Sequence, residues 1–109
     1  MSESCCGGPS EASRRTSDDK PAVVESQQKF FDFLKSANAP GALDARTKRA
    51  VAIALSVLAR CEPCVKSHVK KAREEGFSQE AIDEAAWMAI SFGGSPTMMF
   101  YNETKKNER

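Results

Sequence analysis

The sequence predicts an all-α protein, built as a bundle of about five helices, and three observations lead to this fold class. Apolar residues recur in several segments with the period of about 3.6 residues that places them on one face of a helix. Ser, Asp, Pro and Gly, the residues that begin or end helices, separate those segments. No segment alternates apolar and polar residues in the way that a half-buried strand requires.

The first twenty residues do not share this pattern. Residues 1–20 are rich in Ser, Gly, Asp and Arg and contain almost no large apolar side chain. Burial therefore cannot compensate for the entropy that ordering them would cost. We expect a disordered tail over residues 1–20 and one helical domain over residues 21–109.

The first expected helix covers residues 22–37, where apolar residues form a broad stripe at helical spacing. Pro21 suits its first turn, because the N–H that proline lacks would have no helical partner there. Asp19 can cap this turn with its carboxylate. The Asn-Ala-Pro-Gly sequence of residues 38–41 then breaks the helix.

The second expected helix begins at Asp44 and continues to about Arg60. Its stretch 50–59 is apolar on nearly all sides. A helix of that kind is typical of the centre of a domain, where neighbours cover every face. We therefore expect this helix to be central and buried.

The third expected helix begins at the turn formed by Cys61 and Pro63. Proline is tolerated at the start of a helix but not in its interior, so the helix cannot begin much earlier. It runs to Glu75, and Gly76 ends it because glycine readily adopts the left-handed conformation found after helices.

Two further helices complete the bundle. Ser78 caps a helix over residues 79–92, which Gly93 and Gly94 end. The Ser-Pro pair at residues 95–96 repeats the signal of a cap followed by proline, and it starts a last helix that runs toward the charged C-terminal residues.

The composition excludes several classes of protein. The 16 basic and 15 acidic residues give a net charge of +1, which supplies no coherent positive field for a nucleic acid or an anionic membrane. No run of about 18 uncharged apolar residues is present to span a bilayer. The first residues lack the basic start and apolar stretch of a secretory signal, so we expect a cytoplasmic protein. In that compartment its four cysteines indicate thiol chemistry or metal binding rather than a disulfide framework.

The motif Cys61-x-x-Cys64-x-x-x-His68 carries the most specific chemistry in the chain. Cys64 and His68 lie one helical turn apart, and therefore on one face and within reach of each other. Cys61 lies at the helix start, where free backbone N–H groups and the helix dipole stabilise a thiolate. The spacing lets the two sulfurs form a disulfide without unfolding the helix, and His68 can take a proton from Cys64.

Other interpretations of the motif stay open. The two cysteines can be small buried core residues. They can also be half of a zinc site that Cys5 or Cys6 would complete. Haem attachment is excluded, because it requires a histidine directly after the second cysteine, and Val65 occupies that position.

Several motifs, in their order and spacing, resemble the alkylhydroperoxidase D and carboxymuconolactone decarboxylase superfamily over about residues 43–101. They are Leu43-Asp-Ala-Arg-Thr-Lys, the apolar stretch 50–59, Cys61-Glu-Pro-Cys-Val-Lys-Ser-His68, Val69-Lys-Lys-Ala-Arg-Glu-Glu-Gly76, Ser78-Gln-Glu-Ala-Ile and Gly93-Gly94-Ser-Pro. The resemblance implies an all-α fold and a homotrimer or homohexamer. It also implies that the cysteine pair reduces peroxides or disulfides, as in the members that have both cysteines.

The same resemblance implies roles for individual residues. Cys64 would be the attacking thiol, Cys61 the thiol that resolves it into a disulfide, and His68 part of a proton relay. Members that reduce peroxides usually carry a glutamate twelve residues before the first cysteine, and this chain has Arg49 there. Arginine can lower a thiol pKa by its charge but cannot shuttle a proton at neutral pH. A surface arginine without a role is the alternative, and the departure argues against robust peroxide turnover but not against disulfide exchange.

We therefore predict a thiol-dependent oxidoreductase, either a peroxidase or a disulfide reductase, that needs no cofactor and is reset by an external thiol reductant. Cys5 and Cys6 can bind a soft metal or metalloid, pass electrons to the pair, or have no role. Two other functions stay open. One is a metal- or metalloid-binding module that uses Cys5, Cys6, Cys61, Cys64 and His68, and the other is a decarboxylase-type lyase that uses His68.

Overall fold

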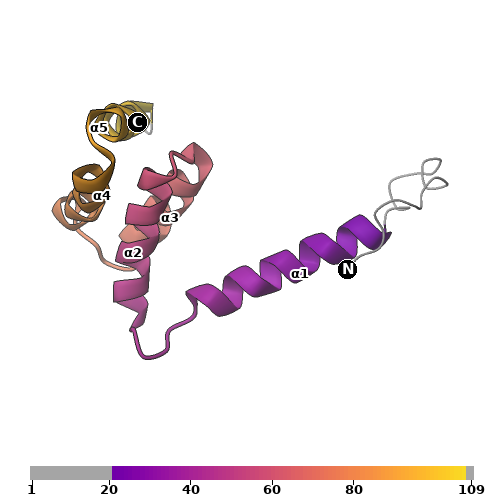
Figure 1. Ribbon diagram of the computed structural model, residues 1–109. Coiled ribbons are helices and arrows are strands. Elements are labelled where there is room, and N and C mark those ends of the chain that lie inside the picture. The colour runs from indigo at the N-terminus through magenta and orange to yellow at the C-terminus, as the bar shows by residue number, and fades with distance from the viewer. Residues whose placement is uncertain (1–20, 108–109) are drawn as a thin grey trace. The chain divides into compact units, whose positions relative to one another are not determined.

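The computed structural model describes residues 21–107, which contain helices and turns but no strand, so the all-α prediction is confirmed. The helices are α1 (Pro21–Asn38), α2 (Ala45–Leu58), α3 (Glu62–Glu74), α4 (Gln79–Gly93) and α5 (Ser95–Asn107) (Figure 1). Within this part of the chain, none of the helices is long and apolar enough to cross a bilayer. The expected tail over residues 1–20 and the cap at Asp19 lie outside the described residues.

The chain divides into two units between Ala37 and Asn38, which separates α1 from the other four helices. Helix α1 has Pro21 in its first turn, as expected, and none of its residues is buried. Its apolar stripe includes Phe30 and Phe31, whose ring centroids are 6.3 Å apart. The single helical domain expected over residues 21–109 stays a prediction.

Helix α2 begins and ends at residues with distinct backbone conformations. Asp44 caps its start, and a carboxylate oxygen accepts a hydrogen bond of 2.8 Å from the Thr47 backbone N–H. At the other end Arg60 has a φ of 56°, in the left-handed region that non-glycine residues seldom adopt. The helix expected to reach Arg60 therefore ends at Leu58, because the chain must turn sharply there to begin α3.

The core of the second unit forms where α3, α4 and α5 each pack against α2 (Figure 1). Every helix of the unit contributes fully buried side chains. The largest ones with a relative exposure below 2% are Tyr101, Ile53, Ile82, Val57 and Thr97. Burying a side chain of the size of isoleucine contributes about 1.5–3 kcal/mol to folding, so this cluster holds the four helices together.

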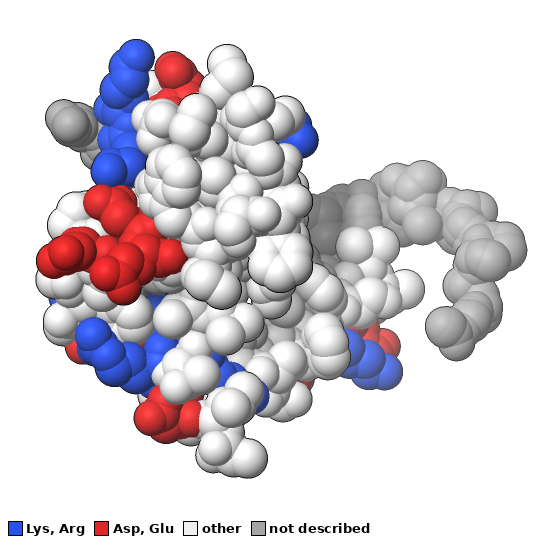
Figure 2. Space-filling view, turned by 60° about the vertical axis from the view of Figure 1, so that its left-hand side comes forward, with Lys and Arg blue, Asp and Glu red and all other residues white. Residues whose placement is uncertain are grey.

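Helix α2 is central, as predicted, but it is buried on one side only. Ile53 and Val57 are fully buried, whereas Val51 is 45% and Leu55 59% exposed. The expectation of a wholly buried helix is wrong for the single chain, because the neighbouring helices leave one face of α2 uncovered. Side chains without charge cover much of the face seen in Figure 2, with Lys, Arg, Asp and Glu gathered in groups beside them.

The junction of α4 and α5 depends on two glycines. Gly94 has a φ of 78°, which glycine adopts without strain. Gly93, the last residue of α4, lies so close to Thr97 that a Cβ atom added to it would overlap the threonine side chain. The same Cβ would lie only 3.1 Å from the Leu58 Cδ1 atom. The two glycines therefore permit the tight turn that the sequence predicts, and Ser95 is the first residue of α5 rather than its cap.

Candidate functional site

A disulfide joins Cys61 to Cys64 at the start of α3, with the two Cα atoms 5.2 Å apart. Cys61 is the N-cap residue and has an extended backbone, while Pro63 occupies the first turn of the helix. The Cys61 Sγ accepts a hydrogen bond of 3.3 Å from the Cys64 backbone N–H. The N-cap position, which an oxygen usually fills, is therefore held by a sulfur.

The two cysteines differ in their access to solvent. Cys64 is exposed and Cys61 is half-buried. The neighbouring Glu62 forms an ion pair of 3.1 Å with Lys66, which balances its negative charge near the sulfurs. A molecule arriving from solvent thus meets Cys64 first, and the interpretation of the cysteines as buried core residues does not apply.

His68 is half-buried one turn after Cys64, and its hydrogen-bond partner is Arg49 from α2. The Arg49 Nη1 atom lies 2.8 Å from the His68 Nδ1 atom. Because a guanidinium group can only donate hydrogen bonds, Nδ1 must accept, and a neutral ring then carries its proton on Nε2. The expected role of His68 as the base for Cys64 stays a prediction, and the acceptor nitrogen of the ring is occupied by Arg49.

Arg49 is itself held by Glu75, the residue that follows the last turn of α3. Its Nε and Nη2 atoms each donate a hydrogen bond of 2.9 Å to one of the two Glu75 carboxylate oxygens. This two-bond arrangement is the strongest geometry available to an arginine–carboxylate pair. The Arg49 side chain is only 18% exposed, and the role expected of it stays a prediction.

Glu75 is the one member of this site that the sequence interpretation did not include. It lies seven residues after His68, close to two helical turns, and therefore returns to the same face of α3. That spacing was available in the sequence, whereas the contact with Arg49 joins residues 26 positions apart. Only the packing of α2 on α3 brings the two side chains together.

The surroundings of His68 favour its neutral form. Burial is the main cause that lowers the pKa of His68, and the positive charges of Arg49 and Lys71 lower it further, while Glu75 acts in the opposite direction. Hydrogen bonding with Arg49 lowers the pKa of Glu75, and the same contact raises that of Arg49. At neutral pH the site therefore contains a charged arginine–glutamate pair beside an uncharged imidazole.

Metal binding by the described part of the chain would require several donor side chains that lie close together. Among residues 21–107, no group of three or more His, Cys, Asp or Glu side chains is arranged to hold one. The remaining members of the expected metal or metalloid module, Cys5 and Cys6, lie outside the described residues.

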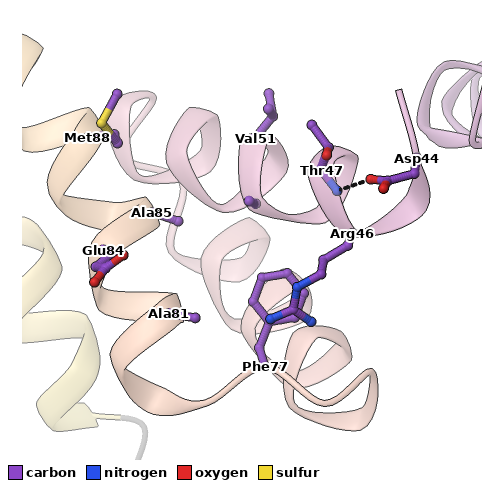
Figure 3. Close-up of a pocket in the computed structure, with 10 residues that line it drawn as sticks. Asp44, Arg46, Thr47, Val51, Phe77, Ala81, Glu84, Ala85 and Met88 are labelled. Atoms are coloured by element: carbon purple, nitrogen blue, oxygen red, sulfur yellow. Dashed lines mark hydrogen bonds between the residues drawn. The ribbon is translucent and has the colours of Figure 1, made fainter. Parts of the chain in front are cut away.

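A separate groove of about 470 Å³ lies between α2 and α4 (Figure 3). Val51 from α2 and Met88 from α4 line it, and the Arg46 guanidinium stacks 4.1 Å from the centroid of the Phe77 ring at one end. Neither cysteine nor His68 lines this groove. It belongs to the exposed side of α2 and α4 rather than to the sulfur site.

Comparisons with known proteins find relatives of this chain by sequence. The sequence profile of the Carboxymuconolactone decarboxylase family matches residues 25–101. An uncharacterised protein encoded in the cox locus of Paracoccus denitrificans is 45% identical over 60 residues, which is 55% of this chain and 54% of the relative. The match thus spans about half of that protein. An uncharacterised protein of Cupriavidus necator is 32% identical over 81 residues, covering 74% of this chain and 69% of the relative.

Solved structures give the same assignment. A carboxymuconolactone decarboxylase family protein from Thermotoga maritima, for which a part in an antioxidative response has been suggested, superposes with a TM-score of 0.68. It is 30% identical, and the match covers 74% of this chain and 84% of that one. A family member from Legionella pneumophila in its apo form has a TM-score of 0.69 and 29% identity, over 78% of this chain and 76% of that chain. The motifs, the helical fold and these matches agree: the chain belongs to the carboxymuconolactone decarboxylase family.

Proposed function

We propose that this protein is a thiol-dependent oxidoreductase that cycles Cys61 and Cys64 between a dithiol and a disulfide. The observation that carries the proposal is the Cys61–Cys64 bond at the exposed start of α3, one turn before His68. Cys64 is the attacking thiol because it is the more exposed of the two. The free N–H groups at the helix start, where Cys61 is the N-cap, favour a thiolate in this pair.

In the oxidising half of the cycle the dithiol gives up two electrons. With a hydroperoxide, the Cys64 thiolate attacks one oxygen, the O–O bond breaks, and the other oxygen leaves as an alcohol after taking a proton. The Cys64 sulfenic acid is then attacked by the Cys61 thiol, which forms the disulfide and releases water. With a disulfide substrate, Cys64 forms a mixed disulfide and releases one thiol, and Cys61 releases the second.

In the reducing half two external thiols of the cytoplasm, our proposed location, return the two electrons and become joined as a disulfide. The first attacks the exposed Cys64 sulfur, and Cys61 leaves as a thiolate. The hydrogen bond from the Cys64 N–H to the Cys61 Sγ, 3.3 Å long in the disulfide, supports that thiolate. Because a stabilised thiolate is a better leaving group, this direction of attack favours rapid reduction. A second thiol then frees Cys64 and completes the cycle.

The experiment that tests the proposal compares two oxidants on the reduced protein. One equivalent of an alkyl hydroperoxide, or of a small disulfide, should produce the Cys61–Cys64 bridge in peptide mass spectra. In the Cys61→Ser variant the hydroperoxide should leave a trappable sulfenic acid on Cys64. Absence of the bridge with both oxidants would contradict the proposal. A bridge with the disulfide alone would identify a disulfide reductase, which is the outcome that Arg49 at the glutamate position favours.

We also propose that the protein assembles as a homotrimer or homohexamer. Helices α2 and α4 carry large apolar side chains that no other helix of the second unit covers, among them Leu55 at 59%, Met88 at 61% and Phe92 at 81% exposure. Apolar patches of this kind on a small protein are typical of surfaces that another chain covers. The sulfur site lies on the α3 side of α2, so such an interface is compatible with access to Cys64.

A further inference from the structure

We propose that Glu75 and Arg49 fix the proton of His68 on Nε2, so that the ring, one turn after Cys64, is a hydrogen-bond donor and cannot be the base for that thiol. Both would be positioning residues that act through the imidazole. The inference deepens the thiol redox function proposed above and depends on it for its meaning. It assigns a purpose to two charged side chains that a disulfide exchange reaction does not itself require.

The direction of the Arg49–His68 hydrogen bond carries the first step. Arg49 Nη1 lies 2.8 Å from His68 Nδ1, and every polar hydrogen of a guanidinium is a donor. Nδ1 therefore offers its lone pair to Arg49. A neutral imidazole has one acceptor nitrogen and one N–H, so the remaining Nε2 must hold the proton. With its lone pair occupied, the ring cannot also accept the Cys64 proton.

The Glu75 carboxylate carries the second step, because it determines where Arg49 points. Two hydrogen bonds of 2.9 Å hold the Nε and Nη2 atoms of Arg49, which leaves Nη1 directed at the ring. Glu75 extends from the end of α3 and His68 from its middle, so the same helix fixes both partners of Arg49. An arginine with a long flexible stem would otherwise sample many orientations.

The charges around the ring carry the third step. Those that act on it are Arg49 from α2 and Lys71 and Glu75 from α3. Two of the three are positive, and burial also disfavours a charged imidazole. The ring therefore stays neutral through the pH range in which thiols begin to ionise, and it can donate its N–H to a thiolate without a proton being transferred.

A donor and a base at position 68 would give the reaction of Cys64 different pH dependences. A histidine that acts as a base must be neutral before attack and charged after it, so its titration appears in the pH dependence of the thiol. A histidine locked as a donor contributes the same hydrogen bond at every pH above its own pKa. The proton that Cys64 loses then goes to solvent, and the rate of the thiol follows its own ionisation alone.

The test uses the fact that His68 is the single histidine among the 109 residues. In protein labelled with ¹⁵N-histidine, long-range proton–nitrogen spectra identify the tautomer, and a pH series gives the midpoint of its titration. The wild-type ring should show only the Nε2–H form, with a midpoint below the ordinary value of 6.5. Arg49→Met should give a mixture of tautomers and raise the midpoint. Glu75→Gln should give a smaller proportion of the same mixture.

Glu74→Gln is the matched control. Glu74 is the exposed last residue of α3, next to Glu75, and this substitution removes the same charge from the same end of the helix. It should leave the tautomer unchanged. Alkylation of Cys64 in the reduced protein, followed as a function of pH by mass spectrometry of the peptide that contains it, supplies a second measurement. The wild type should show one inflection, that of the Cys64 thiol, whereas Arg49→Met should add a second one as His68 titrates.

A wild-type ring with its proton on Nδ1, or charged at pH 7, would overturn the inference. So would an unchanged tautomer in Glu75→Gln and Arg49→Met together, and if Arg49→Met fails to fold, Glu75→Gln decides alone. The spectra are recorded on the oxidised protein and need no turnover. If the ring carries its proton on Nε2 but the reduced protein never re-forms its disulfide, the proposed function is wrong. If the disulfide re-forms but the proton is not on Nε2, only the inference is wrong.

Discussion

Helix α2 presents two surfaces of opposite character, and the contrast explains how a small domain can hold a chemical site. Toward α3 it carries Arg49, whose three hydrogen bonds to His68 and Glu75 are 2.8–2.9 Å long. On its other side Val51 and Leu55 are exposed, and Val51 lines the groove that α2 forms with α4. The polar surface specifies geometry through directional bonds, whereas the apolar one supplies area that a further chain can cover. One helix thus positions a site and leaves an apolar face that its own unit does not cover.

The largest expected effect is on the polar side, where the Cys64→Ser variant should lose turnover. A serine hydroxyl does not ionise near neutral pH, so turnover of a peroxide or disulfide substrate should fall by about 10³-fold or more. Far-ultraviolet circular dichroism should stay the same, because residue 64 is exposed. A steady-state assay with a thiol reductant measures the loss. Activity that survives in a Cys61→Ser, Cys64→Ser double variant would favour a lyase that uses His68.

A core substitution at Ile53 tests the packing shared by both surfaces. Ile53 is fully buried, so Ile53→Ala should lower the free energy of unfolding by about 2–5 kcal/mol through lost burial and a residual cavity. Leu55→Ala, on the same helix at 59% exposure, is the control. Urea unfolding of the dissociated protein at low concentration measures both. Equal losses at the two positions would contradict the difference in burial between the two sides of α2.

The assembly of the apolar surface is tested by Leu55→Glu. A charge placed in an apolar interface cannot be covered by another chain without a large desolvation cost, so the variant should dissociate. Light scattering should then give the monomer mass of 11.9 kDa, whereas the wild type should give three or six times that mass. Asn102→Glu, an exposed polar position on α5, should leave the assembly intact. A wild-type protein of monomer mass would contradict the proposed trimer or hexamer.

The smallest effect should be a loss of stability in mild acid that originates on the polar surface. Burial, and then the charge of Arg49, lowers the pKa of His68 in the folded protein, so the unfolded chain binds a proton there more readily. Stability from this residue is complete above about pH 6.5 and declines as the pH falls through the folded pKa. Urea unfolding at pH 7.5 and 5.5 should show that decline in the wild type and a smaller one in His68→Gln. A larger decline in the variant would contradict the neutral assignment.

Local signals account for most of what could be predicted. Asp44 was recognisable as a helix start and Ser78 as a cap, because each side chain needs only a backbone N–H three residues away. Cys61 and Cys64 were recognisable as a pair for the same reason, since a disulfide across the first turn of a helix depends on local spacing. The family followed from several such signals in order.

What could not be predicted depends on packing between helices. The partners of Arg49 come from α3, 19 and 26 residues away, and no local pattern links them. The end of α2 at Leu58 reflects the left-handed Arg60, which resembles an ordinary helical residue in sequence. The apolar stretch 50–59 predicted a buried helix, which is correct for one face of α2. It could not show that the other helices of the chain leave the second face uncovered.

The sulfur at the N-cap of α3 has a consequence for how the oxidation state is reported. The atom that takes part in the Cys61–Cys64 bond also accepts the Cys64 N–H. A thiolate is a stronger acceptor than a disulfide sulfur, so reduction should tighten that contact. The Cys64 amide hydrogen would then exchange with heavy water more slowly in the reduced protein than in the oxidised one. Its exchange rate would thus report the oxidation state of the cysteine pair.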